Sequence, residues 1–397
     1  MPSTEIAEET GSRRLTWESL ATGAMGLGLA FSALPSLMVS NPPLITYADV
    51  FFVLALAMLL PRMLRGRFDA SPLYLVGALC LVGMSLLSLA LVPQGGHVQG
   101  LFRISYALVV LPTAILLWRP TIERIGFLAG CYVAGTCVSV LYGVMQGPEA
   151  DGRNLGLTLH PNGLGHTAML SIALLPFLLR LRPSARWVLL AAGVICAYGI
   201  WISGSRGSLI GLVLVSLVYI LRERSATAAL FSWGAGILLL IVWPRLAGEN
   251  SNNVLSRVLG GGSAQDATGQ RQLALHQALD QVQAHPFLGN GFETIRAAQI
   301  AYLQVLAALG ILGLVGFVLI LAALSLPVLR GPEPLRLLAY VAVAYVLLAP
   351  FTDSVSDTLV WAPLSLCVVI RPPRDRESET TESSPVARPR ARRLSAT

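Results

Sequence analysis

The sequence predicts an all-α protein: a polytopic membrane helix bundle of about twelve transmembrane helices, with one large extracytoplasmic loop containing an amphipathic helix. Three observations predict this class. Of the 397 residues, 54% are hydrophobic, only 12% are charged, and the mean hydropathy is +0.67. A soluble domain carries about 25% charged residues. The composition therefore excludes a disordered chain, a nucleic-acid-binding domain and a secreted disulfide scaffold for the body of the protein.

A membrane crossing requires about 20 mostly apolar residues. Apolar runs of this length recur along almost the whole chain. The division that follows is a cytoplasmic tail at 1–15, a transmembrane domain at 16–370 with its large outer loop at 245–298, and a disordered cytoplasmic tail at 371–397. The expected spans are 16–38, 44–61, 72–93, 101–118, 126–146, 164–181, 187–203, 207–222, 226–244, 302–328, 335–351 and 354–370.

The arginines predict the orientation. Every one of the 28 basic residues is arginine, and the cytoplasmic loops of membrane proteins carry the excess of basic residues. With both termini in the cytoplasm, every short loop on the inside is basic. Seven arginines then fall at the outer face, where each needs another explanation: Arg103, Arg153, Arg206, Arg245, Arg257, Arg271 and Arg296.

The large outer loop carries a helical pattern. Apolar residues recur at spacings of three and four, and a proline and a glycine-rich turn follow them. We expect an amphipathic helix that lies at the membrane interface or covers a cavity. The apolar positions are Leu273, Leu275, Ala278, Leu279 and Val282, and the terminating segments are His285-Pro286 and Gly289-Asn290-Gly291.

The outer arginines are candidates for binding a phosphate group, because guanidinium pairs bidentately with phosphate oxygens. Arg206 lies in a small-residue break, Ser203-Gly204-Ser205-Arg206-Gly207-Ser208, where hydroxyls such as that of Ser205 and backbone amides can join an anion site. Arg271 and Arg257 would complete it. Two other interpretations stay open: Arg206 caps a helix or reaches lipid headgroups, and Arg271 is a solvated charge at the start of the amphipathic helix.

Histidines near the outer face are candidates for a base or for orienting a substrate. His160 and Asn162, in His160-Pro161-Asn162-Gly163, precede His166 where the smaller outer loop meets a span. Without a nearby carboxylate or cysteine, two histidines predict no metal site. His285 precedes a proline and is typical of a turn. The sequence has no phosphate-binding loop, dinucleotide fingerprint or hydrolase elbow, and we expect no cofactor.

Four segments taken together resemble the O-antigen ligase and O-antigen polymerase superfamily of bacterial envelope glycan enzymes. The resemblance covers roughly residues 150 to 330. The segments are His160-Pro161-Asn162-Gly163-Leu164-Gly165, then Ser203-Gly204-Ser205-Arg206-Gly207, then Thr268-Gly269-Gln270-Arg271 with Ala284-His285-Pro286-Phe287-Leu288-Gly289-Asn290-Gly291-Phe292, and finally Tyr302-Leu303-Gln304-Val305-Leu306-Ala307-Ala308-Leu309-Gly310-Ile311-Leu312-Gly313.

The resemblance implies a metal-independent, inverting glycosyltransferase of the bacterial cytoplasmic (inner) membrane. Such enzymes move a glycan from an undecaprenyl-diphosphate carrier to a lipid or glycan acceptor on the outer face, so the implied partners are donor, acceptor and membrane lipid, with no nucleic acid. Catalytic arginines that neutralise the departing diphosphate match Arg206 and Arg271. Further substrate contacts are expected from Arg257, His160, Asn162, His166, Ser205, His285 and Tyr302.

The chain departs from the family at Gln299, where the family has a histidine proposed as the base. A glutamine amide cannot take up a proton near neutral pH, although it can orient a hydroxyl as a catalytic contact. Either a histidine (His160, His166 or His285) is the base, or deprotonation is late and the arginines carry the catalysis. Alternatively, the protein is a transporter or flippase of lipid-linked saccharide, or a non-catalytic family member in an envelope assembly complex.

Overall fold

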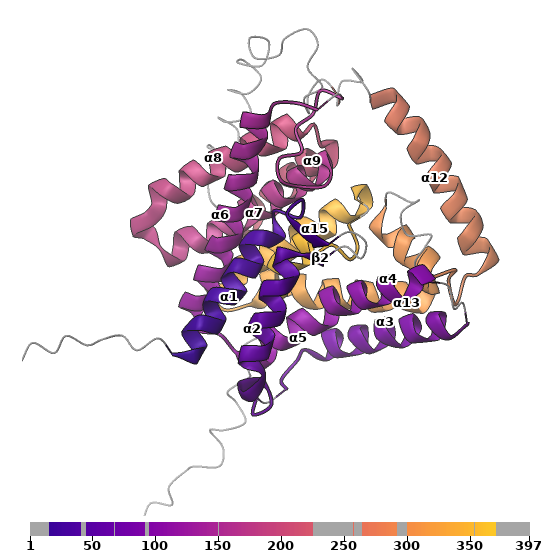
Figure 1. The fold of residues 1–397 in the computed structure, drawn as a ribbon, viewed down its shortest axis with the longest axis horizontal. Helices are drawn as coiled ribbons and strands as arrows, with labels where there is room; N and C mark the ends of the chain where they lie inside the picture. Colours follow the sequence, from indigo (N-terminus) through magenta and orange to yellow (C-terminus); the bar gives the residue numbers. More distant parts are fainter. Residues whose placement is uncertain are drawn as a thin grey trace, which may run out of the picture.

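The computed structural model describes residues 16–40, 45–66, 68–91, 95–149, 151–224, 257, 264–291, 300–352 and 354–370. Within these ranges the chain is almost entirely helical (Figure 1), which confirms the all-α class. The two predicted tails, the expected span at 226–244 and Gln299 lie outside the described residues. Each of the other expected spans contains a helix.

The described helices follow in chain order. The first half of the described chain contains α1 (Trp17–Ser32), α2 (Tyr47–Met63), α3 (Pro72–Leu91), α4 (Gly95–Ser105), the π-helical turn η1 (Tyr106–Val110), α5 (Leu111–Trp118), α6 (Ile122–Gln146), α7 (Pro161–Leu181) and η2 (Pro183–Ala185). The second half contains α8 (Arg186–Ser203), α9 (Arg206–Glu223), α12 (Ala264–Ala284), α13 (Ala301–Ser325), α14 (Pro327–Arg330), η4 (Leu335–Ala339), α15 (Tyr340–Leu348), η5 (Ala349–Phe351), α16 (Thr358–Ser365) and η6 (Leu366–Val369).

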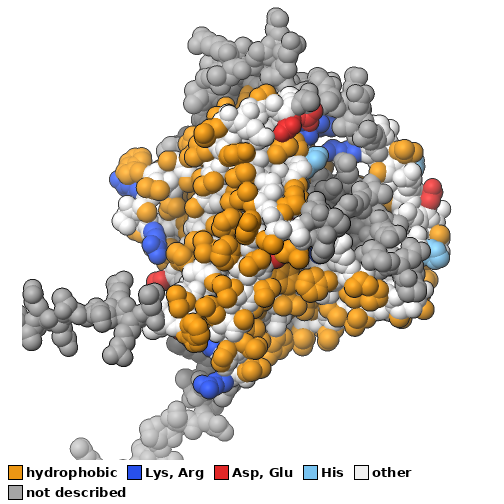
Figure 2. Space-filling view, in the orientation of Figure 1, with side chains coloured by type: hydrophobic (Ala, Val, Ile, Leu, Met, Phe, Trp, Pro, Cys, Tyr) orange, Lys and Arg blue, Asp and Glu red, His pale blue; other side chains and the backbone are white. Residues whose placement is uncertain are grey.

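Six helical stretches among the described residues are long and apolar enough to cross a membrane. Their composition indicates a membrane protein, because about 20 apolar residues span the hydrocarbon core. Figure 2 shows hydrophobic side chains covering the face over α1, α2 and α3, where a soluble protein would carry charges. The six stretches are Pro72–Leu91, Val98–Trp118, Ile122–Gln146, Pro161–Leu181, Pro183–Ser203 and Ala301–Arg330.

The first expected span, 16–38, is wrong at its C-terminal end. α1 stops at Ser32, and the short strand β1 (Met38–Ser40) pairs antiparallel with β2 (Ile45–Thr46). Pro35 lies in the segment between α1 and β1, and proline disfavours a continuing helix because it lacks an N–H group.

Asp49, an acidic residue near the start of an apolar helix, has a structural role there. Its Oδ2 accepts a hydrogen bond of 2.8 Å from the backbone N–H of Thr46 and so caps α2.

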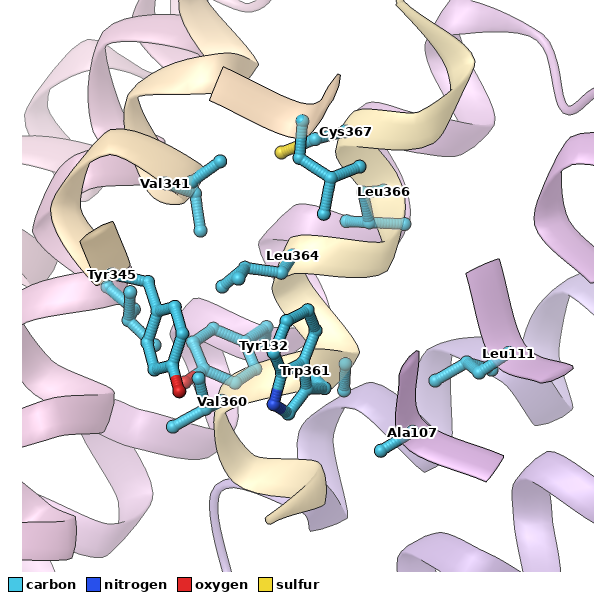
Figure 3. Packing of buried hydrophobic residues seen from close by; sticks show 14 of the residues in the cluster. Ala107, Leu111, Tyr132, Val341, Tyr345, Val360, Trp361, Leu364, Leu366 and Cys367 are labelled. Atoms are coloured by element: carbon cyan, nitrogen blue, oxygen red, sulfur yellow. The ribbon is translucent and has the colours of Figure 1, made fainter. Parts of the chain in front are cut away.

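The core is built around α16. Figure 3 shows the rings of Tyr132, Tyr345 and Trp361 gathered there. The polar atom of each ring donates to a backbone carbonyl oxygen. Tyr132 Oη donates to Leu359 O over 2.7 Å, and Trp361 Nε1 donates to Val355 O over 2.5 Å. Since buried polar groups without a partner are costly, these bonds let aromatic residues fill the centre of the bundle.

The expected span 302–328 is not one straight helix. Gly310 has φ 69° and interrupts α13. In a straight helix Tyr302 and Phe317 would be about 22 Å apart, but their ring centroids lie 5.9 Å apart, so α13 folds sharply at the break. The cause is the segment after α12, which presses against the break: a Cβ on Gly310 would lie 2.0 Å from the carbonyl oxygen of Phe287.

α12 forms where the amphipathic helix was predicted, but its buried face differs in part from the prediction. Ala278 is 1% exposed, whereas Leu273 and Leu279 are 63% and 41% exposed. In Figure 1, α12 runs along the edge of the molecule, and it contacts α13. Arg271 is half-buried and lies on the same face of α12 as Ala278. Leu273 and Leu279 of the predicted apolar face are therefore left exposed.

Ion pairs join helix ends that the arginine pattern places on one side of the membrane. Glu18, at the start of α1, pairs with Arg62 near the end of α2 and with Arg124 near the start of α6. Arg336 pairs with Glu223 over 2.6 Å and also with Glu333. All six of these residues lie at helix ends or connections that the sequence predicts to be cytoplasmic.

Candidate functional site

The site is centred on the break between α8 and α9. Gly204 has φ 63°, a left-handed conformation that glycine adopts without the steric penalty of a side chain, and it ends α8. Ser205 then caps α9: its hydroxyl accepts the N–H of Ser208 and lies 2.9 Å from the Ser208 hydroxyl. Arg206 is the first residue of α9. The small-residue segment predicted from the sequence is therefore a turn that presents Arg206 at a helix N-terminus.

The N-terminus of α7 packs against this turn. His160 caps α7, its Nδ1 accepting the N–H of Asn162 over 3.1 Å, and Pro161 occupies the first helical position. A Cβ on Gly165 would lie 2.7 Å from both Ser205 Cβ and Ser208 Oγ. Because of this close approach, α7 and α9 begin beside each other. The positive ends of two helix dipoles therefore lie in one region.

Arg153 ties the loop before α7 to the end of α8. It is 5% exposed, and its Nη2 donates to Asn162 Oδ1 over 2.7 Å. Its Nε donates to the carbonyl oxygen of Ser203 over 2.8 Å, and Asp151 lies 3.9 Å from Nη1. A bond to Ser203 O also satisfies one of the carbonyls left open where α8 ends.

Arg257 binds the next carbonyl. It is 4% exposed, and its Nη1 donates to the oxygen of Gly204 over 2.9 Å. Within the described residues, its Nε is buried and has no hydrogen-bond partner. A buried cationic donor of this kind is rare in proteins. Among the described residues, the hydrogen-bonding capacity of Arg257 is therefore only partly satisfied.

Electrostatics show that four arginines form one cluster. Burial, followed by the charge of Arg257, lowers the pKa of Arg153 to about 10, and Arg271 and Arg206 contribute further lowering. Burial and then the charges of Arg206 and Arg271 lower the pKa of Arg257. Asp151 opposes both shifts. We call Arg153, Arg206, Arg257 and Arg271 the arginine cluster.

The cluster is an electropositive site. Arg153 stays charged at neutral pH, since its pKa of about 10 still lies well above 7. Like charges held together in a partly buried place repel one another. An anion with two negative charges would relieve this repulsion and supply acceptors for guanidinium donors.

The predicted site histidines are not brought together. His166 is buried in α7, directly after Gly165, and its Nδ1 lies 3.4 Å from Thr352 Oγ1. His285 follows the end of α12, so it lies about 21 Å along the helix from Arg271. Its carbonyl accepts the N–H of Gly289 over 3.0 Å, which is the turn position that its proline predicts.

The contacts of Tyr302, and of the segment around Asn290 and Gly291, are with neighbouring helices. The hydroxyl of Tyr302 donates to the carbonyl oxygen of Val346 in α15 over 3.2 Å. The backbone N–H groups of Asn290 and Gly291 donate to Ala307 and Ala308 of α13 over 2.8 and 3.1 Å. Two of the motifs that carry the resemblance are thus in direct contact, and this contact fixes the end of α12 to α13.

Arg153 was missed as a site residue by the sequence reasoning. It is one of the seven arginines predicted at the outer face, and it lies shortly before the His160-Pro161-Asn162 segment. The available signal was that Arg153 lies at the face where membrane proteins carry few basic residues, so that its presence there needs another explanation. Among the described residues, no group of three or more His, Cys, Asp or Glu side chains is arranged to hold a metal ion.

No protein-family model and no curated protein matches this sequence. The fold and site define an all-helical protein with apolar helices suited to a membrane and a partly buried arginine cluster between α7, α9 and α12.

Proposed function

We propose that this protein transfers a glycan from an undecaprenyl-diphosphate carrier to a lipid or glycan acceptor at the outer face of a bacterial cytoplasmic membrane. The observation that carries the proposal is the arginine cluster, in which the charges of Arg206, Arg257 and Arg271 all act on Arg153. A departing diphosphate needs its developing negative charge neutralised, and preorganised cationic donors do this in a site that excludes water.

The four arginines divide into two pairs by their contacts. Arg153 and Arg257 bind the carbonyls of Ser203 and Gly204 and are almost fully buried. They hold the turn in shape and add positive potential. Arg206 and Arg271 are more exposed and are proposed to bind the diphosphate oxygens directly. The Nε of Arg257, which has no partner within the described part of the chain, is proposed as a further donor.

His166 is the best-placed base among the three histidines. It follows Gly165, whose backbone packs against Ser205 and Ser208, so this turn of α7 lies beside the break that carries Arg206, while the imidazole itself approaches Thr352. His160 already uses Nδ1 as an acceptor for its own helix cap, and His285 lies far along α12 from Arg271. In this mechanism, His166 takes the proton of the acceptor hydroxyl as that oxygen attacks the anomeric carbon from the side opposite the diphosphate.

We place the arginine cluster on the outer face of a twelve-span protein with both termini in the cytoplasm. The ion pairs of Glu18 with Arg62 and Arg124, and of Glu223 with Arg336, would then lie on the inner face. This arrangement supports the proposal because α7 and α9 begin at the cluster and end near Arg180 and Glu223, at the opposite side of the bundle.

Deleting the gene and locating the undecaprenyl-linked precursor tests the function. If the protein is a transferase, precursor accumulates at the outer face and the surface glycan lacks the transferred unit. Accumulation on the cytoplasmic side would instead identify a flippase. An unchanged precursor pool and an unchanged glycan would contradict both activities.

A further inference from the structure

A cavity of about 310 Å³ lies away from the arginine cluster, between the start of α1 and the end of α2. Its apolar part is formed by Met58, Leu59 and Pro61 of α2. Its polar part is formed by Glu18, Arg62 and Arg65. The lining therefore changes from apolar to basic toward the C-terminal end of α2. This change suits an amphipathic ligand.

The charges at the cavity are unbalanced. Glu18 pairs through the same carboxylate oxygen with both Arg62 and Arg124. Arg65 is the second arginine of the lining, and with Arg62 and Arg124 it brings the guanidinium groups around this end of α1 to three. One carboxylate cannot neutralise three cations, so this end of α1 and α2 carries a net positive charge and favours an anion.

The surroundings of the cavity are those of a membrane interface. Trp17, which also lines the cavity, is 68% exposed, and Leu64 of the turn after α2 is 78% exposed. Tryptophan gathers at the level of the lipid headgroups, and basic side chains reach toward them from helix ends. Exposed leucines on the neighbouring surface offer contacts to acyl chains outside the cavity.

We propose that this cavity binds the headgroup of an anionic glycerophospholipid. The phosphodiester lies against Arg62 and Arg65, the glycerol backbone against Met58 and Pro61, and the acyl chains run outside along the apolar surface of α2. The volume is near the lower end for small-molecule sites, so it accommodates a headgroup and not a whole lipid. Basic pockets at helix ends bind anionic headgroups through this combination of charge and apolar contact.

Native mass spectrometry of the full-length protein in detergent tests the site. The purified protein is incubated with phosphatidylglycerol, cardiolipin or phosphatidylcholine of matched acyl chains, and separately with inorganic phosphate. We expect phosphatidylglycerol and cardiolipin to be retained in preference to phosphatidylcholine. Arg65→Gln is expected to weaken retention about fivefold, the effect of one basic residue near a headgroup.

Two further variants separate the cavity from general surface charge. Met58→Trp fills the cavity and leaves every charge in place, and it should abolish the preference for anionic lipid. The control is the double variant Arg182→Gln, Arg186→Gln, which removes two exposed arginines from another basic loop and should leave retention unchanged. Equal melting temperatures show that each variant is folded.

Three results would overturn the lipid site: equal retention of phosphatidylcholine, a loss in the control as large as in Arg65→Gln, or unchanged retention in Met58→Trp. Displacement of the lipid by an equal concentration of inorganic phosphate would also overturn it, since the ligand would then be a free anion. None of these measurements depends on glycan transfer.

Discussion

The guanidinium of Arg153 donates from Nη2 to Oδ1 of Asn162 over 2.7 Å, and this bond joins the loop after α6 to the first turn of α7. The same guanidinium binds the end of α8 through Ser203 O. One buried side chain therefore holds together two of the segments that build the arginine cluster. Its position explains how the His160-Pro161-Asn162 segment reaches the turn at Arg206 although they are far apart in sequence.

Replacing Arg153 by alanine should destabilise the protein and reduce transfer. The acceptors on Asn162 and Ser203 would lose their donor, and an unsatisfied buried polar group costs about 1–3 kcal/mol. Arg153→Lys keeps the charge but cannot reach both acceptors in the same geometry, so it should recover only part of the loss. Melting temperature and transfer rate measure the two effects, with the exposed Arg182→Ala as control. Equal behaviour of Arg153→Ala and Arg182→Ala would contradict the role of Arg153.

A methyl group at Gly310 should disrupt the contact between α13 and the end of α12. The new Cβ would lie 2.0 Å from the carbonyl oxygen of Phe287. The backbone angle φ 69° at this position is also unfavourable for alanine. Gly83→Ala is the matched control, because nothing lies within 4 Å of a Cβ there and alanine is the better helix former. A fall in the melting temperature is expected for Gly310→Ala only. A similar fall for both variants would show that the break is not specifically constrained.

Pyrophosphate should stabilise the folded protein by relieving the repulsion among Arg153, Arg206, Arg257 and Arg271. A ligand that binds only the folded state contributes about 1.4 kcal/mol at ten times its dissociation constant. The melting temperature should therefore rise with pyrophosphate at constant ionic strength, and the rise should be smaller in Arg206→Ala. An equal rise in wild type and Arg206→Ala would place the anion elsewhere.

His166→Ala should lower the transfer rate without weakening binding of the diphosphate donor. In the proposed mechanism His166 removes the proton of the acceptor hydroxyl, so its loss slows the chemical step and leaves the arginine contacts to the diphosphate in place. Transfer kinetics should show a lower rate at an unchanged dissociation constant of the donor. His285→Ala provides the control and should keep the rate.

Gln299→His offers a second test of the base. If His166 accepts the proton, adding a histidine where the resembling family has one should leave the rate unchanged. A clear increase in the rate would show that the base is missing from the natural protein and would contradict the assignment to His166.

The sequence predicted the helical class and the positions of most described helices, because the hydropathy that decides them can be read locally along the chain. The role of Arg206, Arg257 and Arg271 at a diphosphate site stays a prediction. Sequence reasoning did not predict the fold-back of α13 at Gly310, because the cause is a distant backbone segment at Phe287. It also missed Arg153, whose importance depends on partners brought close only by packing.

Transfer by the purified protein in liposomes, with an undecaprenyl-diphosphate-linked glycan as donor, tests the central claim most directly. Wild type should release undecaprenyl diphosphate as the acceptor is glycosylated, and Arg206→Ala and Arg271→Ala should each abolish this release while remaining folded by melting temperature. Transfer at the wild-type rate in either variant would contradict the role of the arginine cluster.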